Sequence, residues 1–359
     1  NGTSWIEEQK LTGTGGASGD QFGVSVAIEQ DTIVVGADGG DAAYVYARGG
    51  GSWNEQIKLT GSIGSLDSYF GQSVAIHEGI LLIAAPYEDT QAGVDAGAVY
   101  IYEQVNGNWT ETGIIEHEDA LAGLKFGSSL AFVSHDKVAI GGEDSVYIFD
   151  RIASDTWRQQ EKLSDVDFGG AQGSNSLSAF GNNLLIGKKS SLYTESSGVW
   201  ALQDELAPSG VLPFKYGDSV ELRGGTALVG ANLDGLSHIN SGAVYVFNRN
   251  NGVWQQGSPL LASDEAQAHA EFAFFGSSIA AKDQHFVVGA FGDAETAAYA
   301  GAAYVFEDRI LVNESSSAGD LVAEIGGVNP DEDLLNFALA SDPSGNFEII
   351  EDNGVWKLV

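Results

Sequence analysis

Six tryptophans divide most of this 359-residue chain into units of similar length. They are Trp5, Trp53, Trp109, Trp157, Trp200 and Trp254, and six positions after each of them comes an aliphatic residue, from Leu11 to Leu260. A fixed register that recurs at intervals of roughly 50 residues is typical of a repeat architecture. The chain is therefore predicted to consist mainly of six copies of one structural unit.

Three further markers lie between the tryptophans. The first is an aromatic residue followed by Gly, found at Phe22-Gly23, Phe70-Gly71, Phe126-Gly127, Tyr216-Gly217 and Phe275-Gly276. The second is a small-residue pair that closes an apolar run, as in Gly36-Ala37, and the third is a β-rich run such as Tyr44-Val45-Tyr46. The fourth copy keeps the spacing but carries weaker versions of all three markers.

These markers predict four short strands per unit. The apolar runs are rich in β-branched and aromatic residues, Gly, Asn, Asp and Ser separate them, and no helical period competes. Four strands in about 40–50 residues match a propeller blade. We predict an all-β fold in which residues 1–308 form a six-bladed β-propeller of four-stranded antiparallel blades, with seven blades as the alternative. The last unit ends at Tyr304-Val305-Phe306 without a Trp strand, so residues 5–11 are expected to supply its outer strand and close the ring.

The run from Gly19 to Ile28, with Ile33 to Asp38 and Ala43 to Tyr46, resembles the FG-GAP repeat. This repeat forms the blades of integrin α-subunit propellers and of many bacterial surface proteins. The resemblance therefore implies a propeller of a bacterial cell-surface protein. Integrin propellers have seven blades and carry a calcium loop between the first two strands of a blade. Here that connection is short, as at Glu78-Gly79, so the integrin metal sites are not carried over.

The repeat markers stop near Ile310, and residues 309–359 resemble the first half of a cadherin-like β-sandwich repeat. That family binds calcium between modules, and the resemblance maps its ligands onto Glu314, Asn329, Asp331 and Asp333. Asn329 stands where the family has Asp, which would weaken the site. The alternative is that residues 347–356, with an Asn353-Gly354 turn, form a hairpin that packs on the propeller.

Successive antiparallel strands place their connections at alternate ends of a blade. The connections after the second and fourth strands are the longer and more acidic ones, and binding residues gather on loops held by a rigid scaffold. Candidate ligand-binding residues there are Asp20, Asp67, Glu116, Glu118, Asp119, Asp234, Asp264 and Glu265. Because Ca²⁺ prefers carboxylate and carbonyl oxygens, candidate calcium ligands are Asp38, Asp41, Glu88, Asp89, Asp95, Asp293 and Glu295. The alternative for each loop is solvated surface charge.

The composition excludes several classes of partner and of catalytic site. There are 16 Lys and Arg against 50 Asp and Glu, a formal net charge of −34, which disfavours nucleic acid and membrane surfaces as partners. No Cys is present, and no zinc, nucleophile-elbow or phosphate-loop motif appears. We therefore expect no organic cofactor. The tryptophans fit packing between strands better than a sugar-stacking surface.

The leading hypothesis is a non-catalytic extracellular module for ligand binding or adhesion, part of a larger surface or secreted protein. It would bind a protein or glycan through the acidic loops, with Ca²⁺ as a possible cofactor. One alternative is a polysaccharide hydrolase or lyase with a site on the propeller axis. Another is a subunit of an extracellular filament that self-associates through the C-terminal segment. Because the sequence does not begin with Met, we expect it to be a mature or excised piece.

Overall fold

The fold is built from short antiparallel strands, and the only described helical turn is a 3-10 turn at Asp38–Gly40. A computed structural model describes residues 8–65, 67–117, 122–143, 145–153, 156–163, 176–187, 189–210, 212–236, 240–250, 252–262, 273–282, 285–293, 301–307, 323–325, 349–352 and 355–358. The chain divides into two units, Asn1–Ala207 with Lys215–Val220, and Pro208–Phe214 with Glu221–Val359. In the described part, no helix is long and apolar enough to cross a membrane.

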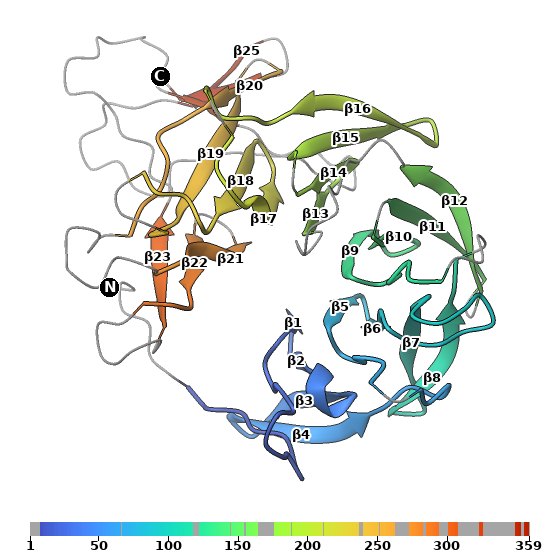
Figure 1. Cartoon of the computed structure of the whole chain (residues 1–359). Helices are drawn as coiled ribbons and strands as arrows, with labels where there is room; N and C mark the ends of the chain where they lie inside the picture. Colours follow the sequence, from blue (N-terminus) through green and yellow to red (C-terminus); the bar gives the residue numbers. More distant parts are fainter. Residues whose placement is uncertain are drawn as a thin grey trace. The chain divides into compact units, whose positions relative to one another are not determined.

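The first four sheets belong to the first unit, and each contains four strands in sequence order (Figure 1). The first contains β1 (Val26–Glu29), β2 (Thr32–Ala37), β3 (Ala42–Gly49) and β4 (Ser52–Leu59). The second contains β5 (Ser73–His77), β6 (Ile80–Ala85), β7 (Ala98–Val105) and β8 (Asn108–Ile115). The third contains β9 (Ser129–Ser134), β10 (Lys137–Gly141), β11 (Val146–Ala153) and β12 (Thr156–Leu163). The fourth contains β13 (Leu177–Phe180), β14 (Asn183–Ile186), β15 (Ser191–Ser196) and β16 (Val199–Glu205).

Three further sheets follow along the chain. The fifth contains β17 (Tyr216–Arg223), β18 (Thr226–Ala231), β19 (Ala243–Asn250) and β20 (Val253–Gln256). The sixth has three described strands, β21 (Phe275–Lys282), β22 (His285–Ala290) and β23 (Ala302–Glu307). Near the C-terminus, β24 (Ala323–Ile325), β25 (Ile349–Asp352) and β26 (Val355–Leu358) form a separate sheet in the order β24-β26-β25.

Described core clusters lie between the first and second, second and third, third and fourth, and fifth and sixth sheets, and strand alternation explains why. On β6, Leu81 and Ile83 pack with Val34 and Val45 of the first sheet, whereas Leu82 points to the other side and packs with residues of the third. Successive side chains of a strand point to opposite faces. A middle strand of a blade is therefore apolar on both faces, and burying each such side chain contributes roughly 1.5–3 kcal/mol.

The repeated aromatic residue packs inside its own blade. Phe70 is 1% exposed and makes edge-to-face contacts with Tyr100 and Tyr102 of β7, at ring centroid distances of 5.1 and 6.4 Å. The first, third and sixth repeats have the same arrangement around Phe22, Phe126 and Phe275. This geometry accounts for two of the sequence markers, since the aromatic-Gly dipeptide and the β-rich run form one packing unit.

The predicted all-β fold of six blades is confirmed. Trp5, which was expected to begin the closing strand, lies outside the described residues. The described residues after Trp5 contact the first sheet in the same way that β12, the outer strand of the third blade, contacts the fourth blade. Gln9 Oε1 accepts a hydrogen bond from Trp53 N at 2.8 Å, as Glu161 Oε2 accepts one from Trp200 N at 3.2 Å. Closure of the ring stays a prediction.

Two strands pair in the segment of the alternative C-terminal hairpin, and its packing on the propeller stays a prediction. β25 and β26 pair antiparallel, with Asp352 opposite Val355, so Asn353 and Gly354 connect them. Whether residues 309–359 are a cadherin-like repeat is not tested, because most of this segment lies outside the described residues.

Candidate functional site

Each blade has one end with tight turns and one end with longer loops. The connections from first to second and from third to fourth strand are all two residues long by the strand bounds. Several use two left-handed residues, such as Asn106 at φ 52° and Gly107 at φ 80°, which suit tight hairpins. We call the other end of each blade, where the chain leaves its second and fourth strands, the loop face.

On the loop face, the residue before the buried aromatic has a left-handed backbone in five repeats. These residues are Gln21 (φ 55°), Tyr69 (φ 57°), Lys125 (φ 51°), Lys215 (φ 61°) and Phe274 (φ 57°). Positive φ is uncommon for residues other than Gly, Asn and Asp and costs on the order of 1–3 kcal/mol. The Gly after the aromatic also has positive φ, and in the second repeat its N–H donates to Ala84 O at 2.9 Å. The repeat backbone therefore imposes the conformation, while the side chain is free to differ.

In three repeats this left-handed residue pairs with a residue just after the second strand. We call these pairs the loop couples. Tyr69 lies 4.8 Å from Tyr87 between ring centroids, Lys125 Nζ lies 3.8 Å from Glu143 Oε2, and Phe274 stacks on Phe291 at 4.7 Å. One backbone arrangement thus presents an aromatic pair, an ion pair and a second aromatic pair.

The loop that carries Tyr69 is fixed by Asp41 of the preceding blade. Asp41 Oδ1 accepts hydrogen bonds from Ser68 Oγ at 3.2 Å and Phe70 N at 3.3 Å, and its Oδ2 accepts one from Asp67 N at 3.2 Å. Asp41 was predicted to be a calcium ligand. Its carboxylate instead joins the first two blades.

Three of the predicted acidic site residues bond to a tyrosine of their own blade. Tyr100 donates to Glu88 Oε2 at 2.8 Å, Tyr245 to Asp234 Oδ2 at 2.5 Å, and Tyr304 to Asp293 Oδ2 at 2.8 Å. Glu88 and Asp293 are almost fully buried. Burial and the neighbouring Glu88 carboxylate raise the pKa of the Tyr100 hydroxyl, so it remains a donor at neutral pH. These carboxylates have a role in holding the blade together.

Asp38 is buried, and its Oδ1 atom has no hydrogen-bond partner. Burial raises the pKa of this carboxyl, and Asp41 adds to the rise, while hydrogen bonds from the backbone of Asp38 and Gly39 oppose it. Asp20, on the neighbouring loop, is half-buried and accepts a hydrogen bond from Ala17 N at 2.7 Å.

The remaining predicted residues fall into two groups. Asp89, Asp67 and Glu116 are exposed, and Asp89 Oδ1 accepts a hydrogen bond at 2.9 Å from the N–H of half-buried Asp95. The others lie outside the described residues, namely Glu118, Asp119, Asp264, Glu265, Glu295, Glu314, Asn329, Asp331 and Asp333.

The described calcium candidates are not gathered into one cluster of carboxylates. Among the residues that the structure describes, no group of three or more His, Asp or Glu side chains could hold a metal ion. A Ca²⁺ ion needs six to eight oxygens, whereas Glu88, Asp41 and Asp293 already accept hydrogen bonds from protein donors. Calcium binding stays a prediction.

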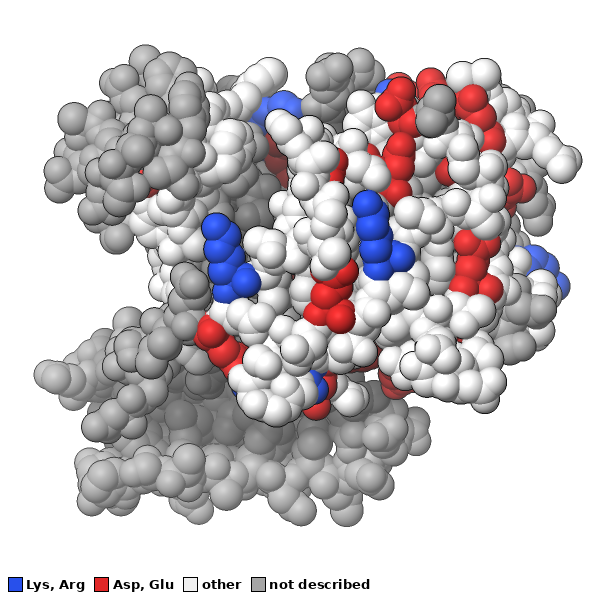
Figure 2. All heavy atoms as spheres, turned by 90° about the horizontal axis from the view of Figure 1, so that it is seen from below, with Lys and Arg blue, Asp and Glu red and all other residues white. Residues whose placement is uncertain are grey.

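The acidic side chains are spread in small groups. On the face shown in Figure 2, Asp and Glu side chains form several separate patches, and single Lys or Arg side chains lie between and beside them. The tryptophans pack as expected. Trp200 is part of a core cluster, and Trp53, Trp109 and Trp157 pack against others.

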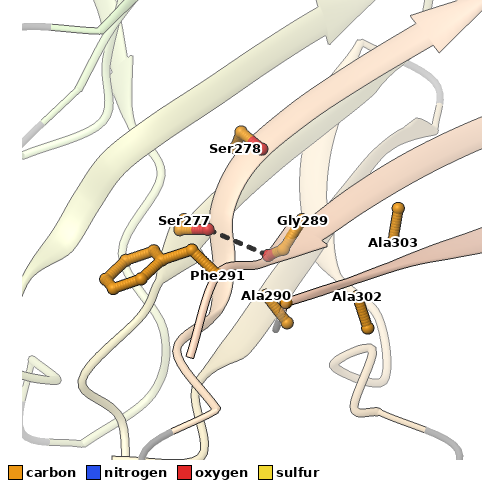
Figure 3. A pocket seen from close by; sticks show the side chains of 8 residues that line it. Ser277, Ser278, Gly289, Ala290, Phe291, Ala302 and Ala303 are labelled. Carbon is orange, nitrogen blue, oxygen red and sulfur yellow. Dashed lines mark hydrogen bonds between the residues drawn. The ribbon is translucent and has the colours of Figure 1, made fainter. Parts of the chain in front are cut away.

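An open pocket of about 350 Å³ lies on the sixth blade (Figure 3). It is lined by Ser277, Ser278, Gly289, Ala290, Phe291, Gly301, Ala302 and Ala303. Ser277 Oγ donates to Gly289 O at 3.1 Å across it. None of the lining residues is a carboxylate, so the acid and base that a glycosidase needs are not among them.

Comparison with known proteins identifies the family. The model of the FG-GAP repeat matches residues 5–49, 53–102, 200–247 and 254–306, together more than half of the chain. The chain belongs to the FG-GAP repeat family. The third blade and the first three strands of the fourth lie in the unmatched stretch, yet the strands of both blades follow the same order.

A crystal structure of a protein from Lactobacillus plantarum aligns with a TM-score of 0.52, over 80% of this chain and 81% of that chain, at 12% identity. This similarity supports the fold alone. The comparison with curated proteins gave no match. An FG-GAP propeller is consistent with a module for ligand binding or adhesion.

The loop couples were missed by the sequence reasoning, which searched the loops for carboxylates. The sequence does contain a pattern that indicates them. When the repeats are aligned on the aromatic-Gly dipeptide, the preceding residue changes from Gln to Tyr to Lys to Phe while the dipeptide persists.

Proposed function

We propose that this chain is a non-catalytic extracellular module for ligand binding or adhesion, part of a larger surface or secreted protein, and that it binds through the loop face. One observation carries the proposal. Five repeats hold a residue in the same left-handed conformation before a buried aromatic, and that residue differs in size, charge and aromaticity. A rigid scaffold with variable side chains at equivalent positions suits recognition.

The hydrogen bonds around these residues support this proposal. Asp41 fixes the loop from Asp67 to Phe70, so Tyr69 is held in place before a ligand arrives. Groups that are ordered in advance lose less conformational entropy on binding. The ligand would be a protein or a glycan at a surface. We place any calcium dependence in the segments that carry Glu295, Glu314, Asn329, Asp331 and Asp333.

The test is a binding screen by biolayer interferometry with immobilised neutral polysaccharides, acidic polysaccharides and extracellular-matrix proteins, in Ca²⁺ and in chelator. Variants Gln21→Ala and Lys125→Ala change the loop face, and Val105→Ala, an exposed residue next to the Asn106-Gly107 turn, is the matched control. We expect loss of binding in the loop-face variants only. Loss in the control variant alone would contradict the proposal, and release of reducing ends from a polysaccharide would favour the hydrolase or lyase alternative.

A further inference from the structure

We propose that the loop couple Tyr69–Tyr87 is a stacking platform for a neutral sugar ring of a polysaccharide. This inference deepens the proposed function, because it names the ligand class and the residues for one part of the loop face.

The two tyrosines form a partly exposed aromatic pair. Tyr69 is 37% exposed and Tyr87 is half-buried, with their rings tilted by 44°. Tyr87 N donates to Ser68 O at 3.1 Å, which ties the two tyrosine loops together next to Tyr69. Ser65 N donates to Glu88 Oε1 at 3.0 Å and Asp89 N to Ser65 Oγ at 3.2 Å, so the same two loops are joined at further points. Hydrogen bonds within the protein therefore hold the two rings together.

Polar groups flank the platform as a sugar would require. Lys125 Nζ lies 5.4 Å from the ring centroid of Tyr87 and can donate hydrogen bonds, while the exposed carboxylate of Asp67 stands two residues before Tyr69 and can accept them. An apolar floor with a few polar groups is typical of small-ligand sites. A sugar ring offers C–H groups to the aromatic faces and hydroxyls to the polar groups.

The charges of these neighbours select among ligands. Lys125 already covers one face of Tyr87, so a cationic side chain would meet a like charge there. Asp67 and Asp89 are exposed on the two tyrosine loops, and their negative charge disfavours uronic and sialic acids. Glu143 pairs with Lys125 at 3.8 Å and offsets the positive charge that would attract such acids. A neutral, polyhydroxylated ring meets neither penalty. The aromatic couple Phe274–Phe291, with Phe291 57% exposed, occupies equivalent loops of the sixth repeat and is a second candidate platform for a neutral sugar ring.

Affinity electrophoresis tests the platform, with gels containing laminarin, mannan, galactan, alginate or polygalacturonate. We expect retardation of the wild-type protein by at least one neutral polysaccharide and by neither acidic one. Tyr69→Ala and Tyr87→Ala should each weaken this binding about 3- to 10-fold, since aromatic contacts of this kind contribute about 0.5–1.5 kcal/mol. Tyr69→Phe should keep the binding, as should Leu202→Ala, a matched exposed apolar residue on β16.

Three results would overturn the inference. They are no retardation by any neutral polysaccharide, retardation that both alanine variants keep in full, and retardation by the acidic polymers alone. Far-ultraviolet circular dichroism and the melting temperature of each variant exclude unfolding as the cause of a loss. Binding of another ligand class that Gln21→Ala or Lys125→Ala removes, but Tyr69→Ala does not, would overturn the sugar platform and leave the proposed function standing.

Discussion

At the scale of single residues, the carboxylates of the loop face have two different roles. Glu88, Asp234 and Asp293 bond to the tyrosine hydroxyl of their own blade, whereas Asp67 and Asp89 reach the solvent. A buried carboxylate is costly unless donors satisfy it. The tyrosine hydroxyl therefore lowers the cost of burying each carboxylate, and the carboxylate in turn satisfies the hydroxyl donor.

Replacing Tyr100 by Phe should destabilise the protein. The substitution leaves Glu88 Oε2 buried without its donor, and we expect the free energy of unfolding to fall by about 1–3 kcal/mol. Urea unfolding followed by tryptophan fluorescence measures the change. Tyr69→Phe removes a hydroxyl from an exposed ring and should change the stability by less than about 0.5 kcal/mol. Equal effects of the two substitutions would show that the Glu88 contact is not stabilising.

High pH should destabilise the fold through its buried tyrosines. Burial raises the pKa of Tyr46 to about 12, with a further contribution from the Glu55 carboxylate. Burial also raises the pKa values of Tyr102 and Tyr245, as it does for Tyr100, and nearby carboxylates add to each rise. An unfolded tyrosine has a pKa near 10, so above about pH 10 the unfolded chain loses protons that the folded chain retains.

The stabilisation that these tyrosines provide is therefore complete below about pH 10 and is lost as the pH rises toward about 12. Urea unfolding at a series of pH values measures the loss, and tyrosinate absorbance of the folded protein follows the titration itself. A free energy of unfolding that stays constant from about pH 9 to 11 would contradict the assignment.

At the scale of the strand and loop, glycine matters where one blade meets the next. Gly97, just before β7, has φ 86°, and a Cβ atom there would lie 2.3 Å from Phe126 O of the third blade. Gly107, in a turn at the opposite end of the same blade, has φ 80°, but a Cβ atom would meet nothing within 4 Å. The two positions share their backbone conformation and differ in the space around them.

Alanine substitutions at these two glycines separate the two effects. Gly107→Ala should cost about 1 kcal/mol, the strain of a left-handed alanine. Gly97→Ala adds a clash with the backbone and should cost about 2–4 kcal/mol. Differential scanning calorimetry of both variants gives the comparison. A melting temperature of Gly97→Ala equal to that of Gly107→Ala would show that the blades can move apart at this joint.

The blades could be predicted from the sequence because every strand repeats its own marker, as Phe70-Gly71 and Tyr100 show. The direction in which an acidic side chain points could not be predicted from the sequence. Glu88 and Asp89 are neighbours in the sequence, yet one is fully buried against Tyr100 and the other is exposed. That difference depends on how the loop after β6 turns the Glu88 side chain toward Tyr100 of β7. The spacing of acidic residues in the sequence does not predict this direction.

At the scale of the whole molecule, calcium is the main open prediction. A bound ion stabilises the folded state by about 2.7 kcal/mol at a hundredfold excess over its Kd. If the C-terminal acids bind calcium, the full chain should melt at a higher temperature in Ca²⁺ than in chelator, and Asp331→Asn should remove the difference. A second variant, Asp89→Asn on the described loop face, should keep it. Identical melting curves in Ca²⁺ and chelator would exclude calcium from the account.

The left-handed residue before each buried aromatic has a consequence for how such a chain can diversify. Four different residue types stand at that position in five repeats, at Gln21, Tyr69, Lys125, Lys215 and Phe274, and all adopt one backbone conformation. Single substitutions there change the surface without refolding a loop. A library that varies these five codons but leaves out Pro and the β-branched residues, which do not suit positive φ, would change the side chains of the loop face while keeping the backbone conformation.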